Sequence, residues 1–324
     1  IAIVAVFLGF DLMNGKMTLL PALSILVLAP EYFLPLRNFA DDYHATLNGK
    51  NALTDVLTVI DMPSVPDQEL LTLPSWQQNS ELNLADVAFS YDTLPTLTNI
   101  NVTAKGYQKI AIVGESGSGK STLLKLLGGF LQPNAGSVIV NGQSLPHLTQ
   151  KSWQQQFFYM PQSPYIFHAS LRDNIKFYTP NTDDVTVESA ITRAGLSPLV
   201  DDLPDGLDTI IGESGRQLSG GQAQRVALAR MLLDSKRKVL LFDEPTAHLD
   251  IETEVELKQT MAPILANHLV FFATHRLHWL DQMDFVLVMA NGEIVETGEP
   301  KALLADENSA LNHLRHELYR GKLV

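Results

Sequence analysis

The chain has 324 residues, enough for one to three domains, and carries a formal net charge of −13. An acidic balance argues against a nucleic-acid partner, because binding a phosphate backbone needs a basic surface. These residues contain no cysteine, which excludes disulfides, zinc-thiolate sites and a cysteine nucleophile within them.

The apolar pattern of the first 36 residues predicts membrane helices. Residues 1–10 are apolar and look like the end of a longer hydrophobic segment, and the polar residues 11–16 separate them from a nearly continuous apolar run at 17–36. About 20 helical residues at roughly 1.5 Å each cross a bilayer core, so we predict a membrane hairpin. A buried helix of a soluble domain is the alternative. Glu31, inside the run, is either a functional intramembrane carboxylate or a residue near the interface with its head in water.

The spacing of apolar residues stays helical over 38–61, which predicts that the helix continues out of the membrane. Prolines and polar residues then indicate a linker. We therefore expect a membrane part at 1–60, a linker at 61–80 and a larger domain at 81–324.

The larger domain shows the pattern of an α/β fold. Residues 82–91 and 97–104 alternate between apolar and polar, as half-buried strands do, whereas 109–114, 239–244 and 269–274 are buried apolar strands. Residues 163–235 are mostly helical in pattern, and 285–298 reads as a hairpin that turns at Asn291-Gly292. Strands that alternate with helices predict a largely parallel sheet.

The sequence GESGSGKST follows one of these strands and opens a helix, which is the context of a phosphate-binding P-loop. Its glycines let backbone N–H groups face phosphate oxygens, and the helix N-terminus adds positive potential. Lys120 is predicted to reach the β- and γ-phosphates and Ser121 to bind Mg²⁺. The predicted nucleotide-binding residues are Gly114, Glu115, Ser116, Gly117, Ser118, Gly119, Lys120, Ser121 and Thr122.

Two carboxylates end the buried strand at 239–244. Asp243 suits a Mg²⁺ contact, and Glu244 is free to orient or deprotonate a water molecule. A strand end with two solvated acids is the plain alternative, which the P-loop upstream makes less favourable.

LSGGQ at 218–222, followed by a helical pattern, completes a set of motifs that resembles the nucleotide-binding domains of ABC transporters. The resemblance implies a P-loop NTPase with a RecA-like core, an antiparallel β subdomain and a helical signature subdomain, which binds ATP and Mg²⁺ and hydrolyses ATP. It also implies that the signature residues bind ATP held by the P-loop of a second subunit. Those residues are Ser219, Gly220, Gly221 and Gln222. The physical basis is a capping serine, exposed glycine N–H groups and a helix dipole aimed at an anion.

Four further positions match elements of that family. Gln162 resembles the Q-loop residue that senses Mg²⁺, Asp250 the D-loop residue, and His275 the switch histidine that contacts the γ-phosphate. Tyr91 resembles the aromatic residue that stacks on adenine, with a place in the core as its alternative. The resemblance thus implies catalytic roles for Lys120, Gln162, Glu244 and His275, and metal contacts from Ser121, Gln162 and Asp243.

Residues 165–175 and 203–221 resemble exporters rather than importers, and a membrane part that precedes the ATPase domain fits the same architecture. Residues 28–45 and 245–250 resemble the CydD-type subunit of the bacterial cysteine/glutathione exporter. This narrower likeness implies a small thiol cargo, a CydC-type partner (a homodimer stays open) and a multi-pass place in the bacterial inner membrane with the ATPase on the cytoplasmic side. A lipid, drug or peptide cargo and a soluble ABC clamp without transport are the alternatives.

Overall fold

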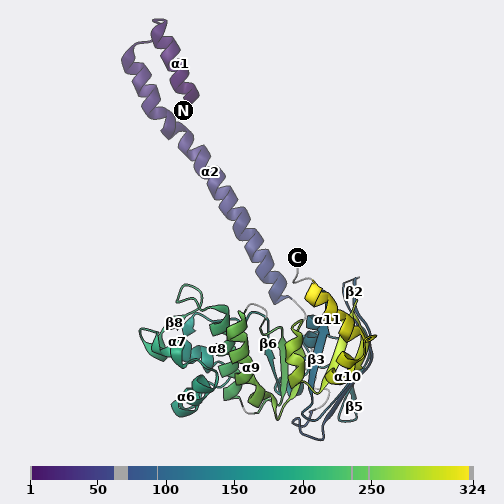
Figure 1. Ribbon diagram of the computed structural model, residues 1–324. Helices are drawn as coiled ribbons and strands as arrows, with labels where there is room; N and C mark the ends of the chain where they lie inside the picture. Colours follow the sequence, from purple (N-terminus) through teal and green to yellow (C-terminus); the bar gives the residue numbers. More distant parts are fainter. Residues whose placement is uncertain (1, 62–71, 93, 235, 247–248, 321–324) are drawn as a thin grey trace. The chain divides into compact units, whose positions relative to one another are not determined.

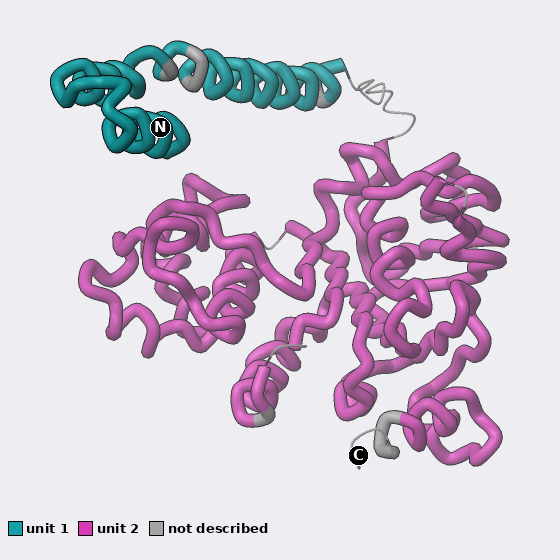
Figure 2. Tube along the Cα trace, turned by 90° about the horizontal axis from the view of Figure 1, so that it is seen from above, with its two compact units in different colours: residues 1–68 teal, residues 69–324 magenta. Residues whose placement is uncertain are grey.

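The computed structural model describes residues 2–61, 72–92, 94–234, 236–246 and 249–320. The chain divides into two compact units, residues 1–68 and 69–324 (Figure 2). Half of the predicted linker, at 62–71, lies outside the described residues, as do residues 247 and 248 of the TAHLD motif. The predicted domain boundaries therefore stay predictions.

The first unit consists of two helices, α1 (Ala2–Met13) and α2 (Leu19–Ile60). Figure 1 shows α1 folded back beside the first part of α2, and the two helices are in contact. The prediction that the helix continues through 38–61 is confirmed, because α2 runs without a break over 42 residues. Among the described residues, however, no helix has both the length and the apolar content needed to cross a membrane, so the predicted span at 17–36 is not confirmed.

The second unit is built on a six-stranded sheet in the order β12-β11-β3-β10-β9-β6, a four-stranded antiparallel sheet in the order β2-β1-β4-β5, and the short pair β7-β8 (Figure 1). Within the six-stranded sheet, β11, β3, β10, β9 and β6 are parallel and β12 pairs antiparallel with β11. The strands are β1 (Glu81–Tyr91), β2 (Leu94–Lys105), β3 (Lys109–Gly114), β4 (Ala135–Val140), β5 (Gln143–Leu145), β6 (Phe157–Met160), β7 (Ala169–Ser170), β8 (Ile210–Ile211), β9 (Val239–Asp243), β10 (Leu269–Ala273), β11 (Phe285–Ala290) and β12 (Glu293–Gly298).

The predicted α/β fold with a largely parallel sheet and an antiparallel β subdomain is confirmed in this unit. The sequence did not predict β6, a four-residue strand at the edge of the larger sheet. The helices are α3 (Lys120–Leu127), α4 (Lys151–Gln154), α5 (Leu171–Ile175), α6 (Asp184–Arg193), α7 (Ser197–Asp201), α8 (Gly220–Leu233), α9 (Ile251–Leu265), α10 (Pro300–Ala305) and α11 (Ala310–Arg320), with 3₁₀ turns η1 (Gly206–Asp208) and η2 (Leu277–Gln282).

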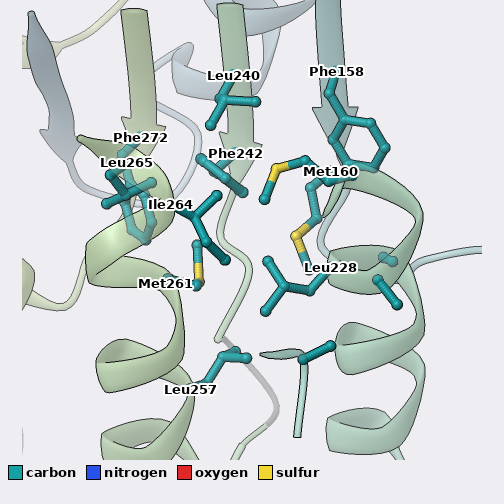
Figure 3. Close-up of a cluster of buried hydrophobic side chains, with 14 of the residues drawn as sticks. Phe158, Met160, Leu228, Leu240, Phe242, Leu257, Met261, Ile264, Leu265 and Phe272 are labelled. Carbon is teal, nitrogen blue, oxygen red and sulfur yellow. The ribbon is translucent and has the colours of Figure 1, made fainter. Parts of the chain in front are cut away.

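The core lies on both faces of the larger sheet. One cluster joins alternate residues of β6, β9 and β10 to α8 and α9, and Figure 3 shows Leu240, Phe242 and Phe272 meeting Leu228 and Met261 there. A second cluster joins the opposite face to α3 and the antiparallel sheet. Every residue of β9 and β10 is buried, as expected of central parallel strands covered on both faces. Their carboxyl ends are therefore held rigidly, and the predicted site lies there.

Candidate nucleotide site

The predicted catalytic motifs meet at one edge of the larger sheet. In the parallel register β10 lies between β3 and β9, and Ala273 pairs with both Ile112 and Asp243. The loops after these three strands carry the P-loop, the acidic pair and the switch histidine. Ligands of open α/β sheets bind at the carboxyl ends of such strands.

The P-loop closes around the end of Lys120. Its ammonium donates to the carbonyl oxygens of Gly114, at 3.0 Å, and Glu115, at 2.8 Å. Burial lowers the pKa of Lys120 below its ordinary value, an effect that Glu244 and Asp243 partly oppose. Gly119, the cap of α3, has φ +101°, a backbone conformation that a side chain would strain. The loop therefore fixes the buried Lys120 ammonium beside the N-terminus of α3.

Asp243 is held by two hydroxyl groups from different elements. Ser121 Oγ donates to its Oδ1 at 2.8 Å, and the Tyr159 hydroxyl donates to its Oδ2 at 3.0 Å. Burial, followed by the Asp243 charge and this hydrogen bond, raises the pKa of Tyr159 above its ordinary value, which keeps the phenol protonated as a donor. The carboxylate is thus fixed beside the first turn of α3.

Glu244 links Lys120 to His275. Its Oε1 lies 3.8 Å from Lys120 Nζ, and its Oε2 lies 3.1 Å from His275 Nδ1. The backbone at Glu244 has φ +49°, a left-handed conformation that costs a non-glycine residue on the order of 1 kcal/mol. Strain of this kind persists where the surroundings enforce it, and here it accompanies a carboxylate placed between a lysine and a histidine.

The residues present fit a nucleotide phosphate and Mg²⁺. The buried Ser118 hydroxyl has no hydrogen-bond partner among the described residues, so an acceptor from outside the chain could satisfy it. In the part of the chain that the structure describes, no three His, Asp or Glu residues gather to hold a metal ion. Asp243 and Ser121 alone are a donor set suited to Mg²⁺, which binds through one or two protein oxygens together with substrate phosphates and water.

The signature residues lie in a different place. Ser219 caps α8: its Oγ accepts from Gln222 N at 3.2 Å, and Gln222 Oε1 accepts from Ser219 N at 2.9 Å. They line a hollow of about 250 Å³ together with the start of α9. Its lining residues are Ser219, Gly220, Gly221, Gln222, Arg225, Leu249, Asp250 and Thr253, none of them from the P-loop. Among the described residues, the hollow at the signature therefore does not include the P-loop.

Two predicted site residues, Gln162 and Tyr91, make no hydrogen bond or ion pair with Asp243 or Glu244 among the described residues. Within the described residues, Gln162 makes its hydrogen bond through its carbonyl, which accepts from Gln224 Nε2 at 2.9 Å, and its side chain is exposed. Tyr91 is 42 % exposed at the end of β1, with its ring edge-on to Phe89 at 4.8 Å. Their roles toward Mg²⁺ and adenine stay predictions.

Residues 97–247 match the family described as "ABC transporter". This segment belongs to the ABC transporter family. The match includes the P-loop, the signature and the acidic pair, so all three motifs lie within one ABC transporter segment.

The relatives that the chain matches include transport proteins and a lipid flippase. The chain is 49 % identical over 304 residues to the "Glutathione/L-cysteine transport system ATP-binding/permease protein CydC" of Bacillus subtilis (strain 168), covering 94 % of this chain and 53 % of the relative. The corresponding CydD protein of Escherichia coli (strain K12) is 33 % identical, over 92 % of this chain and 52 % of its own length. An "ATP-dependent lipid A-core flippase" of Syntrophus aciditrophicus (strain SB) is 30 % identical, over 94 % of this chain and 51 % of the relative.

The likeness extends to solved structures. A bacterial Atm1-family ABC exporter with ATP bound matches with a TM-score of 0.71 and 28 % identity, over 98 % of this chain and 55 % of that one. The chain spans about half the length of the relatives that it matches. The predicted resemblance to an ABC exporter half-transporter is therefore confirmed. The sequence predicted a likeness to the CydD-type subunit, whereas the relative with the higher identity carries the CydC name.

One residue of this ABC site was not predicted from the sequence. Tyr159 lies on the short edge strand β6 and contacts Asp243 across 84 positions of the chain. Its only signal in the sequence is an aromatic residue three positions before Gln162, and an aromatic in an apolar run is ordinarily part of a core.

Proposed function

We propose that this chain is the ATP-hydrolysing part of a bacterial ABC exporter half-transporter. The observation that carries the ATPase role is the convergence of Lys120, Asp243, Glu244 and His275 at the end of three adjacent strands. Three separate loops supply these groups: Glu244 lies 3.8 Å from Lys120 and 3.1 Å from His275, and Asp243 accepts a hydrogen bond from Ser121 next to Lys120.

Each residue has a distinct task in the proposed reaction. The P-loop N–H groups and Lys120 bind the β- and γ-phosphates, and Ser121 with Asp243 would hold Mg²⁺. Bound Mg²⁺ supplies positive charge that neutralises the phosphate oxygens. Glu244 orients a water molecule and accepts its proton as the water oxygen bonds to the γ-phosphorus and ADP leaves. His275 holds the Glu244 carboxylate in position and faces the γ-phosphate.

The complete site requires a second ABC subunit. Ser219 and the glycine N–H groups at the start of α8 form an anion-binding surface that is separate from the P-loop of the same chain. In the proposed assembly this surface closes over ATP on the partner's P-loop, and the partner's signature closes over ATP on this one. A CydC/CydD-type pair is the partner arrangement we propose, because relatives of both names match over more than nine tenths of this chain.

The proposed cargo is cysteine or glutathione, moved out across the bacterial inner membrane, with the ATPase on the cytoplasmic side. The 49 % identity to a glutathione/L-cysteine transport protein supports it. The similarity to a lipid A-core flippase makes lipid export the competing outcome. The apolar side chains exposed along α1 and α2, such as Phe7, Leu20 and Val27, are consistent with a place in the bilayer.

The ATPase role is tested by Glu244→Gln in the intact transporter. We expect the variant to bind ATP with unchanged affinity, to hydrolyse it at least about 100-fold more slowly, and to accumulate as the closed dimer. Glu307→Gln changes an exposed carboxylate outside the site and serves as the matched control. A near-normal rate of phosphate release by the Glu244→Gln variant would show that Glu244 does not activate the attacking water molecule.

The cargo is tested in inverted membrane vesicles that contain the intact transporter. ATP should drive uptake of labelled cysteine or glutathione, and the Glu244→Gln variant should abolish it. ATP-driven movement of a labelled lipid without thiol uptake would favour the flippase alternative instead.

A further inference from the structure

A buried carboxylate on α9 lies outside the proposed reaction. Glu254 is 4 % exposed, and it lies in the first turns of the helix that Asp250 caps. Burying an ionised carboxylate is costly unless several donors satisfy it. The donors around Glu254 therefore identify the segments of the chain that this side chain joins.

Three of the groups that face it follow His275 directly in the sequence. Arg276 Nη1 donates to Glu254 Oε2, Trp279 Nε1 donates to Oε1 at 3.3 Å, and His278 Nε2 lies 3.2 Å from Oε1. One carboxylate thus binds three side chains within the four residues after the switch histidine.

The same cluster reaches back to the acidic pair. The Thr246 side chain, 1 % exposed and two residues after Glu244, lies close enough to Glu254 to help lower the pKa of that carboxyl. Arg276 Nη2 also donates to the carbonyl of Leu249, at 3.4 Å, next to the D-loop Asp250. The cluster therefore ties together the segments that carry Glu244, Asp250 and His275.

The charge of Glu254 persists in this setting. Burial acts to raise its pKa, but the interactions with Thr246 and Arg276 outweigh burial and lower the pKa below its ordinary value. The carboxylate is thus an ionised acceptor over the working pH range.

We propose that Glu254 is a positioning residue that holds the His275 loop at the distance from Glu244 that hydrolysis requires. The inference rests on the proposed ATPase function but concerns a residue that touches neither nucleotide nor metal. Glu254 acts through Arg276, whose backbone follows His275 directly and is further fixed by Thr274 Oγ1 at 2.9 Å.

The test is a comparison of two carboxylates that bind α9 to the segment after His275. Glu254→Gln removes the buried charge. Asp281→Asn instead weakens an exposed ion pair, in which Asp281 Oδ1 lies 2.7 Å from Nζ of Lys258, a residue of α9 like Glu254. In the intact transporter, we expect Glu254→Gln to lower kcat for ATP roughly tenfold with KM within about twofold of wild type. Asp281→Asn should change neither value by more than about twofold.

A double-mutant cycle separates positioning from general damage. If Glu254 acts through His275, Glu254→Gln should lower kcat much less in the His275→Ala background than it does in wild type. An equal loss in both backgrounds, or an unchanged kcat in Glu254→Gln, would overturn the proposal. If Glu254→Gln does not fold because Arg276 is left uncompensated, the neutral pair Glu254→Gln/Arg276→Gln takes its place, with the same expected results.

A measurement that does not depend on ATP hydrolysis tests this proposal separately from the ATPase function. The side-chain NMR signal of His275 should shift in Glu254→Gln and stay in place in Asp281→Asn. If wild-type protein hydrolyses no ATP, the proposed function fails, and the His275 signal still decides whether Glu254 positions the loop. An unchanged signal would refute it.

Discussion

At the scale of single residues, the site is organised before any ligand arrives. Both oxygens of Asp243 accept a hydroxyl hydrogen bond, from Ser121 on α3 and from Tyr159 on β6, and Glu244 already lies between Lys120 and His275. Groups fixed in this way need little rearrangement during reaction, which is how preorganised polar sites lower a barrier.

Tyr159→Phe should weaken Mg²⁺ binding at the proposed site without unfolding the domain. The change leaves the ring in place and removes one hydrogen bond to a carboxylate, which is worth on the order of 1.5–3 kcal/mol where it is formed. We expect the Mg²⁺ concentration for half-maximal ATP hydrolysis to rise several-fold, while metal-free ATP binding, measured by fluorescence of a labelled nucleotide, stays unchanged.

Tyr178→Phe is the matched control, because the Tyr178 ring lies under Arg237, with 4.8 Å between the guanidinium and the ring centre, and the change preserves that contact. An identical Mg²⁺ titration in Tyr159→Phe and wild type would show that the Tyr159 hydroxyl does not position Asp243.

The sequence predicted the residues that local spacing places at strand ends, and it failed for those that depend on remote partners. Lys120 and His275 each come after a recognisable apolar strand and Asp243 ends another, so their convergence follows from a parallel sheet. Tyr159 and Glu254 have no such signal. An aromatic in an apolar run and a glutamate on a helix are common everywhere, and only the three-dimensional pairing gives them a role.

At the scale of elements, α8 is fixed at its start by the Ser219–Gln222 capping box and near its end by Arg230. Arg230 is 6 % exposed; it donates to Asn174 O and Oδ1, at 2.7 and 2.8 Å, and to Tyr165 O at 2.8 Å. Burial lowers the pKa of Arg230 below its ordinary value. The signature helix is thereby joined to the segment that follows Gln162.

Arg230→Ala should destabilise the domain by about 2–4 kcal/mol, because it breaks three hydrogen bonds and leaves buried acceptors unsatisfied. The measurement is the free energy of unfolding from denaturant titration. Arg230→Lys keeps the charge but lacks the planar set of donors, so it should fall between wild type and alanine. Equal stability of wild type and Arg230→Ala would contradict this account of α8.

The sequence predicted a helix after LSGGQ, and the structure confirms it. It could not predict that an arginine on that helix is buried, because its partners lie 56 and 65 positions away. Arginine is almost never fully buried unless it is paired, so exposure is the expectation from sequence alone.

At the scale of the whole molecule, the separation of the P-loop from the signature hollow implies that one chain holds two half-sites. If ATP is enclosed between subunits, a probe on the P-loop must reach the signature segment of a partner, and only when ATP is bound. These 324 residues contain no cysteine, so Ser116→Cys introduces a single attachment point within them, on an exposed P-loop residue.

We expect a benzophenone-maleimide probe at Ser116→Cys, in the Glu244→Gln background with ATP and Mg²⁺, to cross-link to a partner peptide that carries a signature motif. The mass of the cross-linked product and mass spectrometry of its peptides identify the partner: residues 218–225 in a product with twice the mass of the chain would establish a homodimer, and another LSGGQ-like sequence a heterodimer. Glu307→Cys, outside the site, is the control and should give no such product. Cross-links found only in products with the mass of a single chain, with ATP bound, would contradict the composite site, because the proposed closure over ATP places the partner's signature opposite the P-loop.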